Sequence, residues 1–119
     1  MTRDFDLIRK ILLYVEENHR GIYDRLNPLE GYSEEEFLYH CELLTDNGFI
    51  EGKVHRVMDG SGTFMCKDLT WDGQDYLAKI KNDTVWNKVK KSAKDKGIEL
   101  TIEIISRIAT KIIEDQMGI

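Results

Sequence analysis

The side chains that could take part in catalysis or hold a metal are three histidines, two cysteines and a run of glutamates. His19, His40 and His55 are far apart along the chain, whereas His40 and Cys41 are neighbours. Neighbours on a helix point about 100° apart, so these two do not form a cysteine–histidine pair directly. The sequence holds no HExxH motif, glycine-rich phosphate loop or nucleophile elbow. We therefore expect no enzymatic activity, and no metal or cofactor site.

The glutamate run favours a structural role. Glu34, Glu35 and Glu36 are consecutive, and consecutive residues of a helix diverge instead of forming one acid–base or metal cluster. Ser33 followed three residues later by Glu36 has the spacing of a capping box, and acidic residues suit the first turn of a helix. These residues therefore predict the start of a helix over 33–47.

The same helix has a predicted buried face and a predicted end. Phe37, Cys41 and Leu44 follow at helical spacing, and Gly48 supplies a left-handed exit into a strand. Cys41 and Cys66 are isolated thiols without CxxC spacing. We expect both to be buried small hydrophobic residues in a reducing cytosol.

The elements that would position these residues can be read on either side of this helix. The patterns predict a helix over 4–17, a hairpin of strands 49–58 and 63–69 around Asp59-Gly60-Ser61-Gly62, and helices beginning near Trp71, over 84–96 and over 101–117. Residues 18–32 carry turn signals and leave room for one helical turn or a short strand. A complete helix-turn-helix would need another helix there.

This order of elements predicts an α+β fold that is mostly α. We expect a winged helix-turn-helix-like domain over 1–82, with a β-hairpin wing near 49–69. The remaining residues, 83–119, predict a C-terminal helical extension that packs on this domain or on a dimer mate. With 119 residues, the chain has room for one such compact domain and its extension.

Charge is strongly segregated along the chain. The formal net charge is −5, but residues 1–52 carry −7 and residues 79–98 carry +5. No apolar run approaches the roughly 20 residues of a membrane span. The first ten residues lack the apolar core of a signal peptide, so we expect a cytoplasmic protein.

The predicted helix over 33–47 occupies the position of a DNA-reading helix but has the wrong charge. With its apolar face inward, it presents Glu35, Tyr39 and Glu42 outward, and carboxylates repel phosphate. We therefore predict an interaction surface for protein partners. It consists of these three residues and of the lysine-rich helix, with Lys88, Lys90, Lys91 and Lys94.

DNA binding is the alternative hypothesis. A DNA-binding transcriptional regulator would use the lysine-rich helix and cations of the hairpin wing, and would keep the helix over 33–47 away from the bases. The predicted wing contacts are Lys53, His55, Arg56 and Lys67.

The last helix carries a wide stripe of isoleucines. Two interpretations remain open: the stripe completes the core of its own chain, or it forms a homodimer interface through Ile102, Ile105 and Ile112.

Several motifs resemble a known family over nearly the whole chain. RDFDLIRKIL, GYSEEEFLYH with GFIEG, and LTWDGQDYL followed by NDTVWNKVK are similar to an uncharacterised family of small winged-helix proteins from phages, prophages and their bacterial hosts, a domain of unknown function. YjcQ-like small phage-derived proteins are similar over the hairpin and the helix with Trp86. The resemblance implies a winged-helix fold, a cytoplasmic setting and a phage or prophage origin, and it implies no catalytic or ligand-binding residues.

Overall fold

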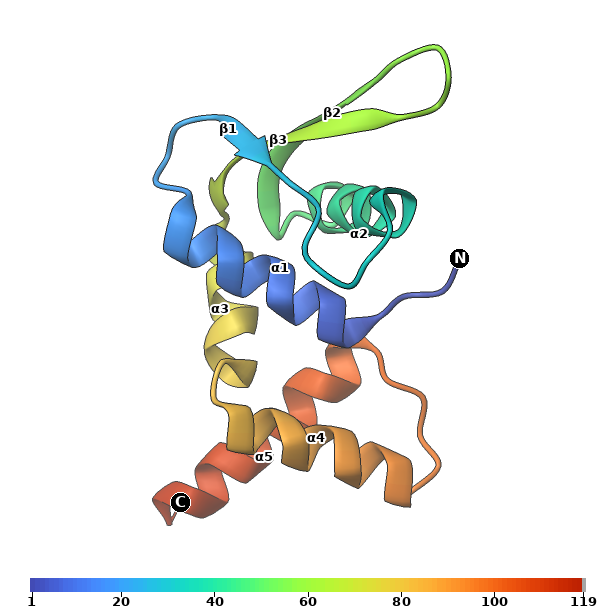
Figure 1. Cartoon of the computed structure of the whole chain (residues 1–119). Coiled ribbons are helices and arrows are strands. Elements are labelled where there is room, and N and C mark those ends of the chain that lie inside the picture. The colour runs from blue at the N-terminus through green and yellow to red at the C-terminus, as the bar shows by residue number, and fades with distance from the viewer. Residues whose placement is uncertain (119) are drawn as a thin grey trace. The chain divides into compact units, whose positions relative to one another are not determined.

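The computed structural model describes residues 1–118 and has an α+β fold that is mostly helical, as predicted (Figure 1). The described residues form five helices and one three-stranded antiparallel sheet. The elements are α1 (Phe5–Asn18), β1 (Asp24–Leu26), α2 (Glu34–Asp46), β2 (Ile50–Arg56), β3 (Gly62–Leu69), α3 (Trp71–Ile80), α4 (Asp83–Asp95) and α5 (Ile102–Met117). The chain divides into two compact units, Met1–Gln74 and Asp75–Ile119. The predicted boundary after residue 82 stays a prediction.

Helix α1 begins at an aspartate cap, where Oδ1 of Asp4 accepts a hydrogen bond from the Leu7 N–H at 3.1 Å. One face of the helix is buried and apolar, with Leu7, Ile8, Ile11, Leu12 and Val15. The helix ends where the His19 N–H donates to the Val15 carbonyl. It matches the predicted helix over 4–17 to within one residue.

The segment between α1 and α2 contains the short strand β1 and no helix within the described residues 19–33. β1 pairs antiparallel with β3, and Leu26 lies opposite Phe64. The Gly21 N–H also donates to the Lys67 carbonyl at 3.1 Å. The prediction that this segment has room for only a turn or a short strand is confirmed.

The predicted signals at both ends of α2 are present in the structure. Oγ of Ser33 accepts a hydrogen bond from the Glu36 N–H at 3.1 Å, and Gly48 leaves the helix with a φ of 77°. The buried side chains are the predicted Phe37, Cys41 and Leu44, together with Leu38 and His40. Because α2 packs on α1 and on the hairpin through these residues, its outer side stays at the surface.

Strands β2 and β3 form the predicted hairpin, and β3 is the central strand of the order β1-β3-β2. The Val57 N–H donates to the Ser61 carbonyl at 2.9 Å and closes the turn. The register shifts between Glu51 and Gly52. A Cβ on Gly52 would overlap the ring of Phe64, so glycine is what lets β2 cross over this buried ring.

Helix α3 starts against the hairpin by a close backbone approach. Oγ1 of Thr70 accepts from the Gly73 N–H at 3.0 Å, and the Thr70 N–H donates to the Phe49 carbonyl at 3.0 Å. A Cβ on Gly73 would overlap this same carbonyl oxygen. Glycine at position 73 therefore allows the first turn of α3 to lie beside the start of the hairpin.

In the second unit, α4 and α5 pack against each other. Oδ1 of Asn82 caps α4 by accepting from the Val85 N–H at 3.1 Å, and α4 ends before Gly97, with a φ of 66°. Both helices lie within a few residues of their predicted ranges. Along α5, Ile105 and Ala109 are fully buried, and the half-buried isoleucines are Ile102, Ile104, Ile108, Ile112 and Ile113.

The described helices are too short or too polar to span a bilayer. The longest, α5, has 16 residues and carries Glu103, Arg107 and Lys111 among its isoleucines. A membrane-spanning helix needs about 20 mostly apolar residues.

Candidate functional site

The outer side of α2 carries the three residues that the sequence assigned to an interaction surface. Glu35, Tyr39 and Glu42 are spaced four and three residues apart, so they lie on one side of the helix. Glu35 is exposed, and Tyr39 and Glu42 are half-buried. This side of α2 therefore forms a continuous acidic strip with one aromatic ring in it.

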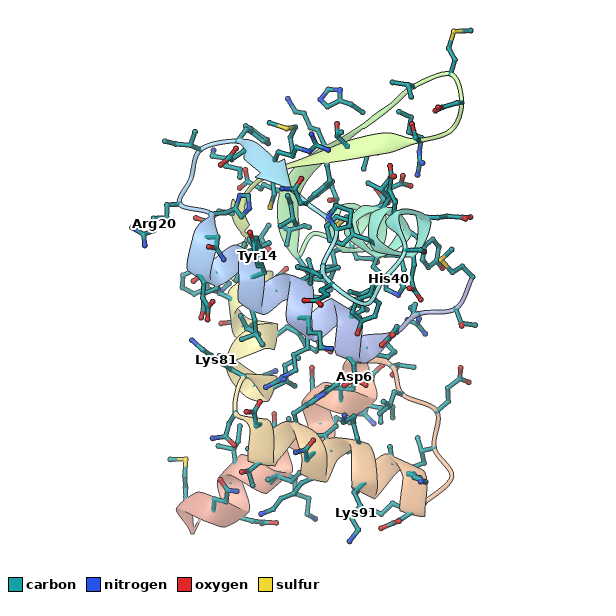
Figure 2. The ribbon with its side chains drawn as sticks, viewed as in Figure 1. Asp6, Tyr14, Arg20, His40, Lys81 and Lys91 are labelled. Carbon is teal, nitrogen blue, oxygen red and sulfur yellow. The ribbon has the colours of Figure 1, made fainter. Side chains whose placement is uncertain are left out.

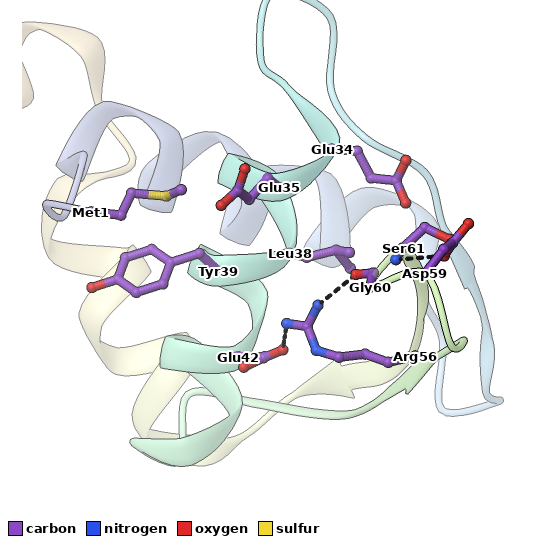
Figure 3. Close-up of a pocket in the computed structure, with 10 residues that line it drawn as sticks. All are labelled: Met1, Glu34, Glu35, Leu38, Tyr39, Glu42, Arg56, Asp59, Gly60 and Ser61. Carbon is purple, nitrogen blue, oxygen red and sulfur yellow. Dashed lines mark hydrogen bonds and ion pairs between the residues drawn. The ribbon is translucent and has the colours of Figure 1, made fainter.

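This strip is one wall of a groove of about 550 Å³. The other walls come from the end of β2, from the hairpin turn and from the first residue of the chain (Figure 3). The lining residues are Met1, Glu34, Glu35, Leu38, Tyr39, Glu42, Arg56, Asp59, Gly60 and Ser61. The structure thus brings the predicted strip on α2 together with one predicted wing cation, Arg56.

The hairpin is held against α2 by two polar contacts. Arg56 forms an ion pair with Glu42 (Figure 3). Oε1 of Glu34 accepts a hydrogen bond from the Gly62 N–H at 3.2 Å. Arg56 also donates to the Gly60 carbonyl at 3.4 Å. These contacts are surface-exposed and individually weak, so they orient the hairpin more than they stabilise it.

The hairpin turn is shaped by Asp59. Its Oδ1 accepts hydrogen bonds from the Ser61 N–H at 2.9 Å and from the Ser61 hydroxyl at 2.7 Å. Because these bonds favour the ionised form, they lower the pKa of the Asp59 carboxyl below its usual value. A negative charge is therefore kept at the rim of the groove.

The N-terminal residues are held beside the groove by His40, which is fully buried on α2. Its Nε2 accepts a hydrogen bond from the Asp4 N–H at 2.8 Å. Its Nδ1 lies 2.7 Å from the Glu36 carbonyl oxygen. Since a backbone N–H can only donate, Nε2 must be the acceptor and Nδ1 must carry the proton. The neutral imidazole thus ties the segment that ends in Met1 to the helix.

The four predicted wing cations differ in their surroundings. Arg56 is paired with Glu42, and Nζ of Lys67 lies 3.7 Å from Oε2 of Glu51. Nζ of Lys53 lies 5.0 Å from the centre of the Tyr23 ring, a cation–π contact. His55 is exposed. Three of the four side chains therefore already contact partners within their own unit.

Three of the four predicted lysines of α4 lie on the side of the helix opposite its buried residues. Lys88, Lys91 and Lys94 are exposed, and Figure 2 shows the Lys91 side chain pointing outward from α4. Nζ of Lys90 instead lies 5.6 Å from the centre of the buried Trp86 ring. A shallow hollow of about 310 Å³ on this helix is lined by Lys88, Lys91, Ser92, Asp95 and Lys96.

The cysteines are buried, as predicted. Burial raises the pKa of the Cys66 thiol to about 12 and raises the pKa of the Cys41 thiol further, so both are protonated at neutral pH. Within residues 1–118, no three His, Cys, Asp or Glu side chains lie close enough together to hold a metal ion. The buried His19 has its Nδ1 3.0 Å from the Cys66 carbonyl oxygen.

Sequence reasoning missed part of the groove. From the sequence, Glu34 is predicted at the start of the helix and Asp59 in the hairpin turn, neither of them in the interaction surface, and Met1 and Leu38 have no predicted role. Their place in the groove depends on contacts between distant segments, such as the one that joins Glu34 to Gly62. The sequence signals that point to the groove are the acidic outer side of α2 and the position of the hairpin turn.

The chain is similar to proteins whose descriptions state no activity. The model of a family described as "Hypothetical protein (DUF2513)" matches residues 2–99, a range that includes α4 and the groove residues other than Met1. An uncharacterised protein of Haemophilus influenzae strain Rd is 35% identical over 119 residues, which cover 99% of this chain and 100% of that protein. No solved structure matches the chain. The prediction that the chain belongs to a family of unknown function is confirmed.

Proposed function

The chain belongs to the DUF2513 family, for which no activity is established, and from that premise we propose that it is a non-enzymatic winged-helix protein. The order α1, β1, α2, β2, β3 and the position of β3 between the other strands support this proposal. In such an arrangement, α2 takes the position of a recognition helix and the hairpin that of a wing. The proposed phage or prophage origin is supported by the sequence resemblance alone.

We propose that the protein is an interaction module that binds another protein through the groove between α2 and the hairpin. The observation that carries the proposal is the set of carboxylates at this position. Glu34, Glu35, Glu42 and Asp59 line the groove, whereas Arg56, its one lysine or arginine, is paired with Glu42. A partner that enters the groove therefore meets an excess of negative charge.

The chemistry of the groove favours a basic segment as its occupant. Glu35 has no ion-pair partner among residues 1–118, so a lysine or arginine of a partner can pair with it. Tyr39 supplies apolar surface beside it, which suits the aliphatic stem of a long cationic side chain. The tyrosine ring can also accept a cation–π contact.

A DNA-binding regulator that uses the wing and the lysine-rich helix is the second candidate. Its support is the exposed row of Lys88, Lys91 and Lys94 on α4. Two of the proposed wing contacts, Arg56 and Lys67, are paired with glutamates, which must be displaced before either side chain can reach a phosphate. We therefore rank DNA binding below protein binding.

Self-association through the isoleucines of α5 also remains a proposal. Of the three isoleucines predicted for a dimer interface, Ile105 is already fully buried within the chain. Ile102 and Ile112 are half-buried and keep some surface for a partner.

The proposal is tested by titrating the full chain with a short fluorescein-labelled peptide rich in arginine and lysine. Fluorescence anisotropy reports binding at low salt. Glu35→Lys should weaken binding about tenfold, since it replaces an unpaired carboxylate in the groove by a cation. Glu17→Lys is the matched control, because it makes the same charge change on the exposed side of α1 and should alter the affinity less than about twofold.

Two results would overturn this function. One is a lack of peptide binding by the wild-type chain at low salt. The other is equal weakening by Glu35→Lys and Glu17→Lys, which would mean that net charge and not the groove attracts the peptide. A parallel titration with labelled duplex DNA tests the second candidate, which predicts a steep loss of affinity with salt and loss of binding in the Lys90→Glu, Lys94→Glu variant.

A further inference from the structure

The exposed side of α4 is a second charged surface with a regular geometry. Lys88, Lys91 and Lys94 are three residues apart, so successive lysines lie about 4.5 Å apart along the helix axis. None of the three has an ion-pair partner within residues 1–118. We call these three residues the lysine row.

The lysine row is held on a well-anchored helix. The opposite side of α4 buries Val85, Trp86, Val89 and Ala93, and Asn82 caps its first turn. The lysines are therefore presented from a fixed backbone, and only their side chains must be ordered when they bind a partner.

The acidic strip of α2 has matching charge and matching length. Glu35 and Glu42 are seven residues apart, which is about 10 Å along α2, and the lysine row extends over about 9 Å. Residues 1–74 carry a formal charge of −7, from 15 acidic and 8 basic side chains. Residues 75–119 carry +2, and five lysines of this part lie between residues 88 and 96. Each chain thus carries two surfaces of opposite charge and similar dimensions.

From these observations we propose that the groove accepts the lysine row of α4 from a second copy of the chain. The inference rests on the proposed function of the groove and names its partner. A Lys91 that enters the groove would pair with the unpaired Glu35, and its stem would lie against Tyr39. Because every copy carries both surfaces, each molecule can act as donor and as acceptor, so copies of the chain can associate through this contact.

The contact is between exposed charges, so salt should control it. At physiological ionic strength the Debye length is about 8 Å, and at 1 M salt it is about 3 Å. We expect the chain to self-associate at low salt and to become monomeric at high salt. An association through the isoleucines of α5 would instead be kept or strengthened in high salt, because it would bury apolar surface.

Sedimentation equilibrium of the full chain tests the proposal. At low salt, the wild-type chain should show a concentration-dependent mass above the 13.9 kDa of one copy. Lys88→Glu with Lys91→Glu, and separately Glu35→Lys, should each weaken association at least about fivefold. Lys111→Glu on α5 and Glu17→Lys on α1 are the matched controls and should leave the association constant within about twofold.

A charge exchange gives the sharpest version of the test. The chain that combines Glu35→Lys with Lys88→Glu and Lys91→Glu should associate again, because attraction is restored with the two signs exchanged. All substituted positions are exposed, and circular dichroism shows whether each variant keeps its fold.

A wild-type chain that stays monomeric at low salt would overturn the inference, as would a charge-exchanged chain that fails to associate. If the basic peptide binds the groove and the wild-type chain is monomeric, the proposed function stands and only the identity of the partner is wrong. If the peptide does not bind, the proposed function itself fails, and the inference fails with it.

Discussion

Helices α2 and α4 have similar buried faces, but their exposed sides carry opposite charges. Each has 13 residues, begins after a side-chain cap and buries one face. The exposed side of α2 carries glutamates and is enclosed by the hairpin into a groove. The exposed side of α4 carries lysines and borders a shallow hollow.

Folding requires the caps and the buried faces of the two helices, but it does not require a particular charge on their exposed sides. The caps Ser33 and Asn82 and the buried faces are needed for either helix to form and pack. Neither requirement determines the charge of the outer side, because a solvated lysine and a solvated glutamate stabilise a helix about equally. We therefore propose that the protein functions through the opposite charges of these two outer sides.

Substitutions in the buried faces of the two helices should have the largest effects on the free energy of unfolding. Trp86→Ala removes a nearly fully buried ring from α4 and should lower the free energy of unfolding by about 4 kcal/mol. Urea unfolding followed by circular dichroism measures the change. Trp71→Ala is the control, since this tryptophan is 80% exposed and its loss should cost less than about 0.5 kcal/mol. Equal losses for the two variants would contradict the assignment of the buried face.

The buried face of α2 differs from that of α4 in one polar residue. His40→Leu keeps a side chain of similar size but removes the acceptor of the Asp4 N–H, and should cost about 2 kcal/mol. His55→Leu, at an exposed position on the hairpin, should stay within about 0.5 kcal/mol of the wild type. Amide hydrogen exchange should also show faster exchange at Asp4 in His40→Leu; unchanged exchange there would contradict the tether.

Removing the N-terminal cap should destabilise the protein equally in the two helices. Ser33→Ala and Asn82→Ala each remove a side-chain acceptor from the first turn and should each lower the free energy of unfolding by about 1 kcal/mol. Thermal unfolding of both variants under the same conditions makes the comparison. If one cap mattered much more than the other, the similarity between the two helices would not hold.

The ion pair between hairpin and α2 should affect binding more than stability. Arg56→Ala should lower the free energy of unfolding by about 0.5 kcal/mol, because the pair is exposed. The same change frees Glu42 and should raise the affinity for the basic peptide about threefold. Arg25→Ala removes a similar charge from β1 and serves as the control. Weaker peptide binding by Arg56→Ala would argue that Arg56 itself contacts the partner.

The helices and the hairpin could be predicted because their signals are local. Ser33 and Gly48 mark the two ends of α2, and Asp59 to Gly62 mark the turn, all within a few residues of the elements that they delimit. Propensity, capping and periodicity act over one or two turns of chain, which is the range at which a single sequence is informative.

The groove could be predicted only in part, because its closure depends on contacts between distant residues. The bond from the Asp4 N–H to His40 joins residues 36 apart, and the bond from the Gly62 N–H to Glu34 joins residues 28 apart. No local sequence pattern predicts either contact. Periodicity placed Glu35, Tyr39 and Glu42 on one side of a helix, but the groove also needs the hairpin folded over that side.

We propose that the groove between α2 and the hairpin is the binding surface of this protein. The most direct measurement is an amide chemical-shift titration of the ¹⁵N-labelled chain with the arginine- and lysine-rich peptide. We predict that the largest shifts fall on residues 34–42 of α2 and on residues 56–61 of the hairpin. Shifts confined to α1 and β1, or no shifts at peptide excess and low salt, would contradict the claim.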